Sequence, residues 1–158
     1  MSYNNIEISK MTISDFEEIS SSLLNDFDDF WQPSTLKKEL QSENSYYIVA
    51  RYSSEIVGFA GIKTVLDEAD IMNIVTKKSK RNLGIGSCLL KNLIYIAKEN
   101  DIKKLTLEVN YRNTSAIHLY KKFDFKEIAV RKKYYGNVDN AIIMQLDIFQ
   151  KGGTNEKK

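Results

Sequence analysis

The stretch Arg81-Asn82-Leu83-Gly84-Ile85-Gly86-Ser87 lies between an apolar, strand-like run that ends at Thr76 and an amphipathic helical pattern that starts near Gly86. Two glycines a residue apart allow the backbone to turn tightly and to expose its N–H groups. A helix that opens directly after them adds unpaired N–H groups and the positive end of its dipole. We therefore expect this loop to bind an anion, and phosphate suits such a loop best.

Charge and spacing narrow the choice of ligand. Lys77, Lys78 and Lys80 lead into the loop, and no acidic residue occurs from position 77 through position 98. The P-loop pattern, which needs Gly-Lys-Ser/Thr four residues after a first glycine, is absent. The dinucleotide pattern G-x-G-x-x-G also fails, because Leu89 stands where the third glycine belongs. We expect a phosphorylated cofactor of another kind, and the alternative is a glycine turn that caps an ordinary helix.

The composition is that of a globular protein, and we expect one domain over residues 1–150 followed by a polar tail over 151–158. A net charge of +2 is too small to indicate nucleic acid. Residues 1–31, however, hold seven acidic residues and one basic residue, which favours a cationic partner or a solvated acidic helix. Because the chain has no signal peptide and no apolar run of membrane-spanning length, we expect a cytoplasmic protein without a membrane partner.

Two residue types are too rare to support other kinds of site. The single cysteine, Cys88, excludes a disulfide framework, and its place among leucines predicts a core position. The single histidine, His118, leaves too few soft ligands for zinc, so we expect no metal. His118 lies two residues from Tyr120, on another helix face, and we expect it at the surface.

Hydrophobic periodicity predicts strands and helices in one α+β domain. The expected strands cover Ile6 to Ile8, Tyr46 to Ala50, Ile56 to Leu66, Ala69 to Thr76, Leu105 to Val109, Phe125 to Tyr134 and Ala141 to Ile148, the last two as a hairpin around Gly136-Asn137. The expected helices cover Phe16 to Leu24 after a capping box at Ser14 to Glu17, Ser34 to Gln41, Gly86 to Ala97, and a segment from an Asn113 cap to Lys122.

An acidic, aromatic segment, residues 25–33, separates the first two expected helices. Aromatic residues on an exposed loop are unusual enough to indicate a binding surface, and we place Trp31 there as a substrate-binding residue. The alternative is a hydrophobic plug between the two helices.

Several motifs resemble one enzyme family. Arg81-x-x-Gly84-x-Gly86 matches the Q/R-x-x-G-x-G/A pyrophosphate loop of the GNAT acetyltransferases, which bind acetyl-coenzyme A. The run from Leu107 to Tyr120 resembles the LEVR-x-x-N-x-x-A-I-x-L-Y block of the RimI-type ribosomal-protein alanine N-acetyltransferases in that superfamily. Further matches are Val65 to Ala69, Asn73 to Val75, and Arg131-x-x-Tyr134-Tyr135 before Asn140 to Met144. The resemblance covers roughly Ile8 to Leu146.

The resemblance implies the GNAT fold. This fold is a mixed, mostly antiparallel twisted sheet of six to seven strands, flanked by about four helices and splayed between the fourth and fifth strands. It also implies a cofactor site formed by the backbone of Ile74, Val75 and Thr76, by the loop Arg81, Asn82, Leu83, Gly84, Ile85, Gly86 and Ser87, and by Asn113 and Tyr120.

The family assigns two side chains to acyl transfer. Glu108 has the opposite parity to the apolar residues of its strand, so its carboxylate can face a cleft and take the proton of an amine. Tyr120 can donate a proton to the departing thiolate. From the residues alone, a glutamate on the solvated side of the strand and a core tyrosine are the favoured interpretations, and the catalytic roles are what the resemblance implies. We place Tyr134 and Tyr135 with Trp31 and Glu108 in the acceptor site.

Three departures from the family pattern concern the acceptor more than the chemistry. Asn110 replaces the usual arginine, Asp124 replaces a glycine, and Asp139-Asn140 replaces a Glu-Asp pair after a short hairpin. Aspartate tolerates a left-handed backbone, so Asp124 can keep the turn.

The predicted function is transfer of an acetyl group from acetyl-coenzyme A to the N-terminal alanine of a small-subunit ribosomal protein. Of the possible oligomeric states, a monomer is favoured. An N-terminal amine has a pKa of about 7.7–8.0 against about 10.4 for lysine, so a modest base suffices. The alternatives are a GNAT enzyme for a small amine or another protein, and a catalytically idle acyl-coenzyme A-binding protein.

Overall fold

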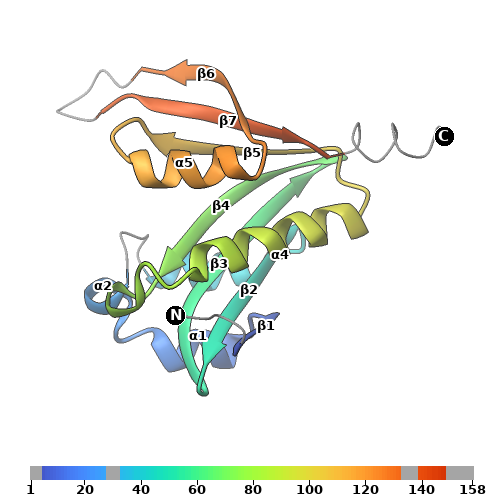
Figure 1. Cartoon of the computed structure of the whole chain (residues 1–158). Coiled ribbons are helices and arrows are strands. Elements are labelled where there is room, and N and C mark those ends of the chain that lie inside the picture. The colour runs from blue at the N-terminus through green and yellow to red at the C-terminus, as the bar shows by residue number, and fades with distance from the viewer. Residues whose placement is uncertain (1–4, 28–32, 133–138, 149–158) are drawn as a thin grey trace. The chain divides into compact units, whose positions relative to one another are not determined.

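The structure is a computed structural model that describes residues 5–27, 33–132 and 139–148. The helices are α1 (Ile13–Ile19), α2 (Leu23–Asp26), α3 (Pro33–Leu40), α4 (Ile85–Glu99) and α5 (Thr114–Lys122), with a 3-10 turn η1 (Lys78–Lys80). The strands are β1 (Ile6–Lys10), β2 (Ser45–Tyr52), β3 (Glu55–Val65), β4 (Glu68–Thr76), β5 (Lys104–Asn110), β6 (Lys126–Arg131) and β7 (Ala141–Asp147). Figure 1 shows these elements along the chain.

The strands follow the order β1-β2-β3-β4-β5-β7-β6 in one mixed sheet. All described pairings are antiparallel except that of β4 with β5, which is parallel and joins Glu68–Asp70 to Lys104–Thr106. The prediction of a mixed, mostly antiparallel sheet with six to seven strands is therefore confirmed, and the described sheet has seven. The chain divides into two compact units, residues 1–65 with 71–96 and residues 66–70 with 97–158.

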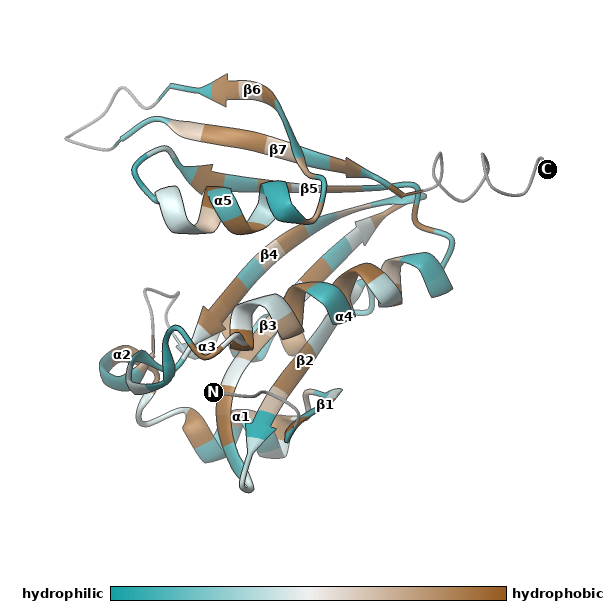
Figure 2. Cartoon of the chain, viewed as in Figure 1, coloured by the Kyte–Doolittle hydropathy of each residue, from teal (hydrophilic) through white to brown (hydrophobic). Residues whose placement is uncertain are grey.

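Unit 1 contains β1 to β3, most of β4, α1 to α3, and α4 as far as Ile96. The turn between β2 and β3 places Ser53 and Ser54 at φ 52° and 71°, the left-handed pair that a two-residue hairpin requires. Figure 2 shows hydrophobic residues along β2, β3 and β4. Side chains from α1 to α3 pack on this sheet, and the resulting core consists of Met11, Phe16, Ile19, Leu23, Phe27, Leu36, Tyr47, Val49, Ile56, Phe59 and Val75.

Helix α4 runs along β2, β3 and β4 in unit 1 (Figure 1). Its apolar face is fully buried at Leu89, Leu90 and Leu93, as the helical spacing predicts. The close approach depends on Gly58 of β3, where an added Cβ would lie 2.9 Å from the carbonyl oxygen of Val75 and within 3.2 Å of Ile85 and Leu89. Gly58 thus sets the distance between β3 and the start of α4.

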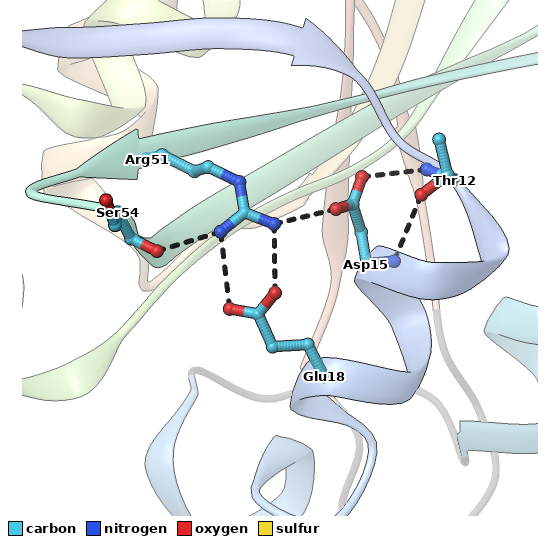
Figure 3. A network of polar contacts seen from close by, with 5 residues as sticks. All are labelled: Thr12, Asp15, Glu18, Arg51 and Ser54. Carbon is cyan, nitrogen blue, oxygen red and sulfur yellow. Dashed lines mark hydrogen bonds and ion pairs between the residues drawn. The ribbon is translucent and has the colours of Figure 1, made fainter.

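A polar network connects α1 to the turn between β2 and β3 (Figure 3). The Arg51 guanidinium contacts Asp15 at 2.7 Å, Glu18 at 2.9 and 3.3 Å, and the carbonyl oxygen of Ser54 at 2.9 Å. Asp15 also accepts a hydrogen bond from the N–H of Thr12 at 2.9 Å, and the Asp15 N–H donates to Thr12 Oγ1 at 3.1 Å. These contacts fix the start of α1 on β2.

The structure corrects the prediction for the first helix. The capping box is Thr12 with Asp15, not Ser14 with Glu17, so the N-cap lies two residues earlier than expected. The helix also ends at Ile19, because the Ser20 and Ser22 hydroxyls hydrogen-bond the carbonyls of Glu17 and Ile19. This break makes α1 and α2 two short helices, and the described residues hold five α-helices where about four were expected.

Unit 2 contains the first residues of β4 with β5, β7, β6 and α5. The apolar side chains of β5 and β7 alternate toward one buried face, which holds Leu105, Leu107, Val109, Met144 and Leu146. The backbone at Asp124 has φ 73°, so aspartate does keep the left-handed turn before Phe125. The turn predicted around Gly136-Asn137 and the polar tail over residues 151–158 lie outside the described residues, and the single domain over residues 1–150 stays a prediction.

Candidate active site

The loop from Arg81 to Ser87 belongs to unit 1 and passes twice through the left-handed region. Asn82 has φ 66° and Gly84 has φ 82°, and asparagine and glycine are the residues that adopt this conformation most easily. Helix α4 then begins at Ile85, and its first bond runs from the N–H of Cys88 to the carbonyl oxygen of Gly84 at 3.0 Å. The N–H groups of Ile85, Gly86 and Ser87 therefore precede the helical bonding pattern and can face a ligand.

The basic residues before this loop are not equivalent. The Lys77 ammonium is paired with the Glu55 carboxylate, and this hydrogen bond holds the pKa of Glu55 below its ordinary value. The positive charge of Lys77, directly after β4, is therefore already neutralised by Glu55 at the start of β3. Lys78 is exposed and Lys80 half-buried in η1, and Arg81 follows them at the start of the loop. These three residues carry the positive charge that the sequence places beside the anion site.

The end of β4 leads into this loop. Val75 is buried in the core, whereas Ile74 and Thr76 are half-buried, so any role of Val75 toward a cofactor lies in its backbone. The N–H of Lys77 donates to the carbonyl oxygen of Val57 at 2.8 Å and ends the regular pairing of β4.

The aromatic segment after α2 begins with Phe27, whose side chain is packed in the core. Phe27 is 2% exposed, its ring lies 6.0 Å from that of Phe59, and its backbone pairs with Lys77. Of the two interpretations of residues 25–33, the hydrophobic plug is therefore correct for Phe27. Trp31 lies outside the described residues, and its predicted role stays a prediction.

Glu108 lies in unit 2, on the solvent side of β5. Its neighbours Leu107 and Val109 are buried and Glu108 is exposed, as the parity of the strand predicts. Its Oε1 atom lies 3.0 Å from Nε of Arg131 on β6. The carboxylate thus faces away from the core and next to a cation.

Asn113 and Tyr120 lie on α5 in the same unit. Asn113 is the N-cap, and its Oδ1 atom accepts a hydrogen bond from the N–H of Ala116 at 3.2 Å, so the predicted capping role is confirmed. The Tyr120 ring packs 5.8 Å from that of Phe125. Burial raises the pKa of Tyr120 to about 12, so its phenol keeps its proton at neutral pH and can donate it.

The remaining candidates have weaker support. His118 is exposed, as predicted, whereas Cys88 is half-buried rather than fully buried. Burial raises the pKa of the Cys88 thiol, which disfavours the reactive thiolate. Tyr134 and Tyr135 lie outside the described residues. Within the described ranges, no group of three acidic, histidine or cysteine side chains could hold a metal ion, and no helix is long and apolar enough to cross a membrane.

The chain matches a known family over most of its length. The model of the acetyltransferase (GNAT) family matches residues 16–125. The chain belongs to the GNAT family of acetyltransferases. It is an N-acetyltransferase that uses acetyl-coenzyme A, as this family does, and the predicted GNAT fold is confirmed.

Two relatives and one further structure show what this GNAT chain is similar to. It is 39% identical over 118 residues to the Haemophilus influenzae ribosomal protein bS18-alanine N-acetyltransferase, covering 72% of this chain and 80% of the relative. The Escherichia coli ribosomal-protein-S18-alanine N-acetyltransferase has a TM-score of 0.82 at 29% identity, with 90% and 94% of the two chains covered. A GNAT acetyltransferase from Elizabethkingia anophelis with bound acetyl-coenzyme A has a TM-score of 0.72 at 22% identity, with 91% and 99% covered.

The residues of unit 1 fit the phosphate end of the GNAT cofactor. The loop combines two left-handed residues, Asn82 and Gly84, with the first N–H groups of a 15-residue helix, and basic residues precede it. These are the elements of a phosphate site. The predicted cofactor residues therefore fall into two groups, with Ile74 to Ser87 in unit 1 and Asn113 and Tyr120 in unit 2.

Two side-chain contacts of unit 2 are not predicted by the sequence of the GNAT chain. One is the ion pair of Glu108 with Arg131, and the other joins Asp139 to Arg112 at 3.0 Å and to Asn110 at 3.3 Å. Arg131 was part of a recognised motif, but the sequence does not give the strand register that brings it to Glu108. Asn110 and Asp139 are both departures from the family pattern, and their joint occurrence was the available signal that they meet.

Proposed function

We propose that this protein transfers the acetyl group of acetyl-coenzyme A to the N-terminal alanine of ribosomal protein bS18 in the cytoplasm. The observation that carries the proposal is the similarity to the Escherichia coli and Haemophilus influenzae enzymes, which are both named for that reaction. Both likenesses extend over most of this chain. The match to the family model, over residues 16–125, includes the segment from Glu108 to Tyr120, to which the family resemblance assigns the chemistry.

The acceptor is an N-terminal amine rather than a lysine side chain. The α-amino group has a reference pKa of about 7.7–8.0, so a sizeable fraction is neutral at physiological pH. A lysine amine, with a pKa of about 10.4, would need a further loss of more than two units. A single exposed carboxylate such as Glu108 is a sufficient base for the first acceptor and a poor one for the second.

Two side chains move protons in the proposed reaction. Glu108 accepts a proton from the acceptor amine, directly or through water, because its carboxylate lies on the solvent side of β5. Tyr120 gives its phenolic proton to the sulfur that leaves, since burial keeps this phenol protonated. A general acid or base in such a position typically contributes 10²–10⁴-fold to the rate.

The proposed cofactor contacts come mainly from backbone atoms. Acetyl-coenzyme A supplies a thioester-activated acetyl group when it is bound. The N–H groups at the start of α4 hold its pyrophosphate, and Arg81 adds positive charge there. The backbone of Ile74, Val75 and Thr76 orients the arm that carries the thioester.

The acceptor itself is recognised by charge in this proposal. The end of α2 and the segment after it are acidic, with Asp26 exposed at the end of α2 and Asp28 and Asp29 beyond the described residues. Ribosomal proteins are commonly basic because they contact RNA, so an acidic surface favours their approach. Trp31, Tyr134 and Tyr135, which lie outside the described residues, remain the proposed contacts for the first residues of the acceptor, and the protein acts as a monomer.

The experiment measures release of coenzyme A with a panel of peptides that differ in their N-terminal residue. We expect release to depend on a peptide with N-terminal alanine and the following residues of bS18. Tyr120→Phe should lower kcat by about 10²-fold or more and leave the affinity for coenzyme A unchanged. Tyr95→Phe, the same change at a tyrosine that is 60% exposed on α4, is the matched control and should have no effect.

Two outcomes would overturn this function. Turnover of small polyamines without turnover of the peptide would assign the protein to small-amine acetylation. Tight binding of acetyl-coenzyme A without thiol release by any amine would make it an idle acyl-coenzyme A-binding protein. Equal activity of the Tyr120→Phe and Tyr95→Phe variants would remove Tyr120 from the mechanism while leaving the acceptor assignment in place.

A further inference from the structure

The register of unit 2 places Arg131 and Glu108 on the same face of the sheet. Glu108 pairs with Ile143 across β5 and β7, and Ile143 pairs with Ala129 across β7 and β6. Paired residues of antiparallel strands share a face, so Glu108 and Ala129 lie in one row. Arg131 lies in the next row, opposite Ala141. Its long side chain must therefore cross β7 diagonally to reach Glu108.

Short side chains border part of this crossing. Ala141 on β7 lies beside Arg131 and Ala129 precedes Arg131 on the same face of β6, whereas Ile143 on β7 lies beside Glu108. Arg131 Nε then meets Glu108 Oε1 at 3.0 Å, a distance typical of a charge-assisted hydrogen bond. The contact links the two outer strands of the β5-β7-β6 group through side chains, over the strand that separates them.

Stability does not account for this pair. The two side chains are 61% and 37% exposed, and ion pairs with this much solvent contact add little to folding. The strands are already joined by backbone pairing, which runs from Lys104 to Asn110 on β5 and, with a register shift between Glu127 and Ala129, from Lys126 to Arg131 on β6. What the contact does determine is the direction in which the Glu108 carboxylate points, because a free glutamate has three rotatable bonds.

We propose that Arg131 is a positioning residue that holds the Glu108 carboxylate in the orientation from which it takes the proton of the acceptor amine. This inference rests on the proposed function, in which Glu108 is the base. The proton passes from the amine nitrogen to a Glu108 oxygen, and Arg131 neither gains nor loses a proton, since its guanidinium stays charged throughout.

The positive charge of Arg131 has a second consequence for the acceptor. An amine that arrives as an ammonium ion is attracted by Glu108 and repelled by Arg131 beside it. The pair therefore offers less attraction to the charged amine than a lone carboxylate would. Loss of Arg131 should weaken catalysis without weakening acceptor binding, and this combination separates positioning from damage to the fold.

The test is a double-mutant cycle of Arg131→Met and Glu108→Gln, with coenzyme A release from the preferred amine as the readout. Methionine keeps an unbranched side chain as far as the position of Nε and removes the charge and the donors of the guanidinium. In the wild-type background, Arg131→Met should lower kcat by about 10- to 100-fold, as expected for a misplaced catalytic group. The acceptor KM should stay the same or fall. In the Glu108→Gln background the same substitution should have no further effect.

Further variants and an unfolding measurement test whether the effect of Arg131→Met comes from the loss of any positive charge on β6 or from damage to the fold. Lys126→Met removes a positive charge from the exposed β6 strand and should leave kcat unchanged. Arg131→Lys keeps the charge without the planar fork and should recover part of the lost rate. The unfolding midpoint of Arg131→Met should lie within about 2 °C of the wild type, since exposed ion pairs contribute little.

Each result bears on the proposal. If Arg131→Met lowers kcat equally in both backgrounds, or not at all in the wild type, Arg131 does not position Glu108, and the proposed function stands. If Glu108→Gln keeps full turnover, the base assignment fails and the positioning role fails with it. The cycle does not depend on the peptide, because any amine that the wild type acetylates serves as the acceptor. If no amine is acetylated, both proposals are wrong.

Discussion

The Nη2 atom of Arg51 lies 2.7 Å from Oδ1 of Asp15, and this ion pair joins β2 to the first turn of α1 (Figure 3). Asp15 is also the acidic partner of the capping box with Thr12. One carboxylate thus starts the helix and attaches it to the sheet. The start of α1 is therefore determined by a residue 36 positions away as well as by its local sequence.

The Asp15 carboxyl makes folding stability depend on pH. Partial burial alone would raise its pKa, but the hydrogen bonds from the Thr12 N–H and from Arg51 outweigh burial and lower the pKa. A lowered pKa stabilises the folded state above the unfolded value of about 3.9, and this contribution is lost as the pH falls through the folded value. Asp15→Asn should cost about 1 kcal/mol at pH 7 and less at pH 3, below the unfolded pKa.

Urea unfolding at the two pH values checks this expectation. Glu17→Gln, on the exposed side of the same helix, is the control and should change stability little at either pH. A difference between wild type and Asp15→Asn that is as large at pH 3 as at pH 7 would show that the carboxylate charge is not involved.

Local sequence predicted much of the fold and misplaced the start of the first helix for a physical reason. Thr12 with Asp15 and Ser14 with Glu17 have the same capping-box spacing, so propensity cannot choose between them. The choice is made by Arg51, whose contact with Asp15 depends on the sheet. In contrast, the Asn113 cap and the turn at Asp124 depend on their own residue types and were predictable.

For the candidate site too, local sequence predicted some features and not others. The glycine loop and the parity of Glu108 follow from local spacing, and both agree with the structure. The contact of Glu108 with Arg131 does not, because the register of β6 shifts between Glu127 and Ala129. A shift of one residue reverses the face of every later side chain, so sequence alone would not place Arg131 correctly.

At position 124, we expect a glycine variant to be at least as stable as the wild type with Asp124. Its φ of 73° is disfavoured for side chains with a Cβ, a cost that glycine does not have. Asp124→Ala should destabilise the protein by about 1 kcal/mol, because alanine tolerates this region less well than aspartate. Asp124→Gly should be as stable as the wild type or more stable. Thermal unfolding of the three proteins decides the order, and an alanine variant as stable as the glycine variant would contradict it.

Tyr120 should remain a proton donor well into the alkaline range. Burial raises its pKa to about 12, so the phenol stays protonated up to about pH 11. We therefore expect kcat to show no decrease near pH 10, where an ordinary tyrosine would ionise. A kcat profile from pH 7 to pH 10.5 measures this directly. A decrease centred near pH 10 in the wild type that is absent from Tyr120→Phe would contradict the buried, neutral phenol.

Two glycines of β3 provide a matched test of the cofactor loop. An added Cβ at Gly58 would lie 2.9 Å from the Val75 carbonyl oxygen and 3.0 Å from Ile85, the first residue of α4. At Gly61 it would lie 2.4 Å from the Tyr47 ring, in the core formed with α1 to α3. Both Gly→Ala variants should lose about 1–3 kcal/mol of stability, because both overfill packed sites.

Only Gly58→Ala should also weaken coenzyme A binding. The new methyl group pushes on the strand end and on the helix start that are proposed to hold the cofactor, whereas Gly61→Ala acts on the other face of β3. We expect Gly58→Ala to raise the coenzyme A Kd by about tenfold, equivalent to about 1.4 kcal/mol, and Gly61→Ala to leave it unchanged. Calorimetric titration of both variants, at a temperature where both are folded, gives the answer. Equal Kd values would mean that the spacing between β3 and α4 does not control the phosphate site.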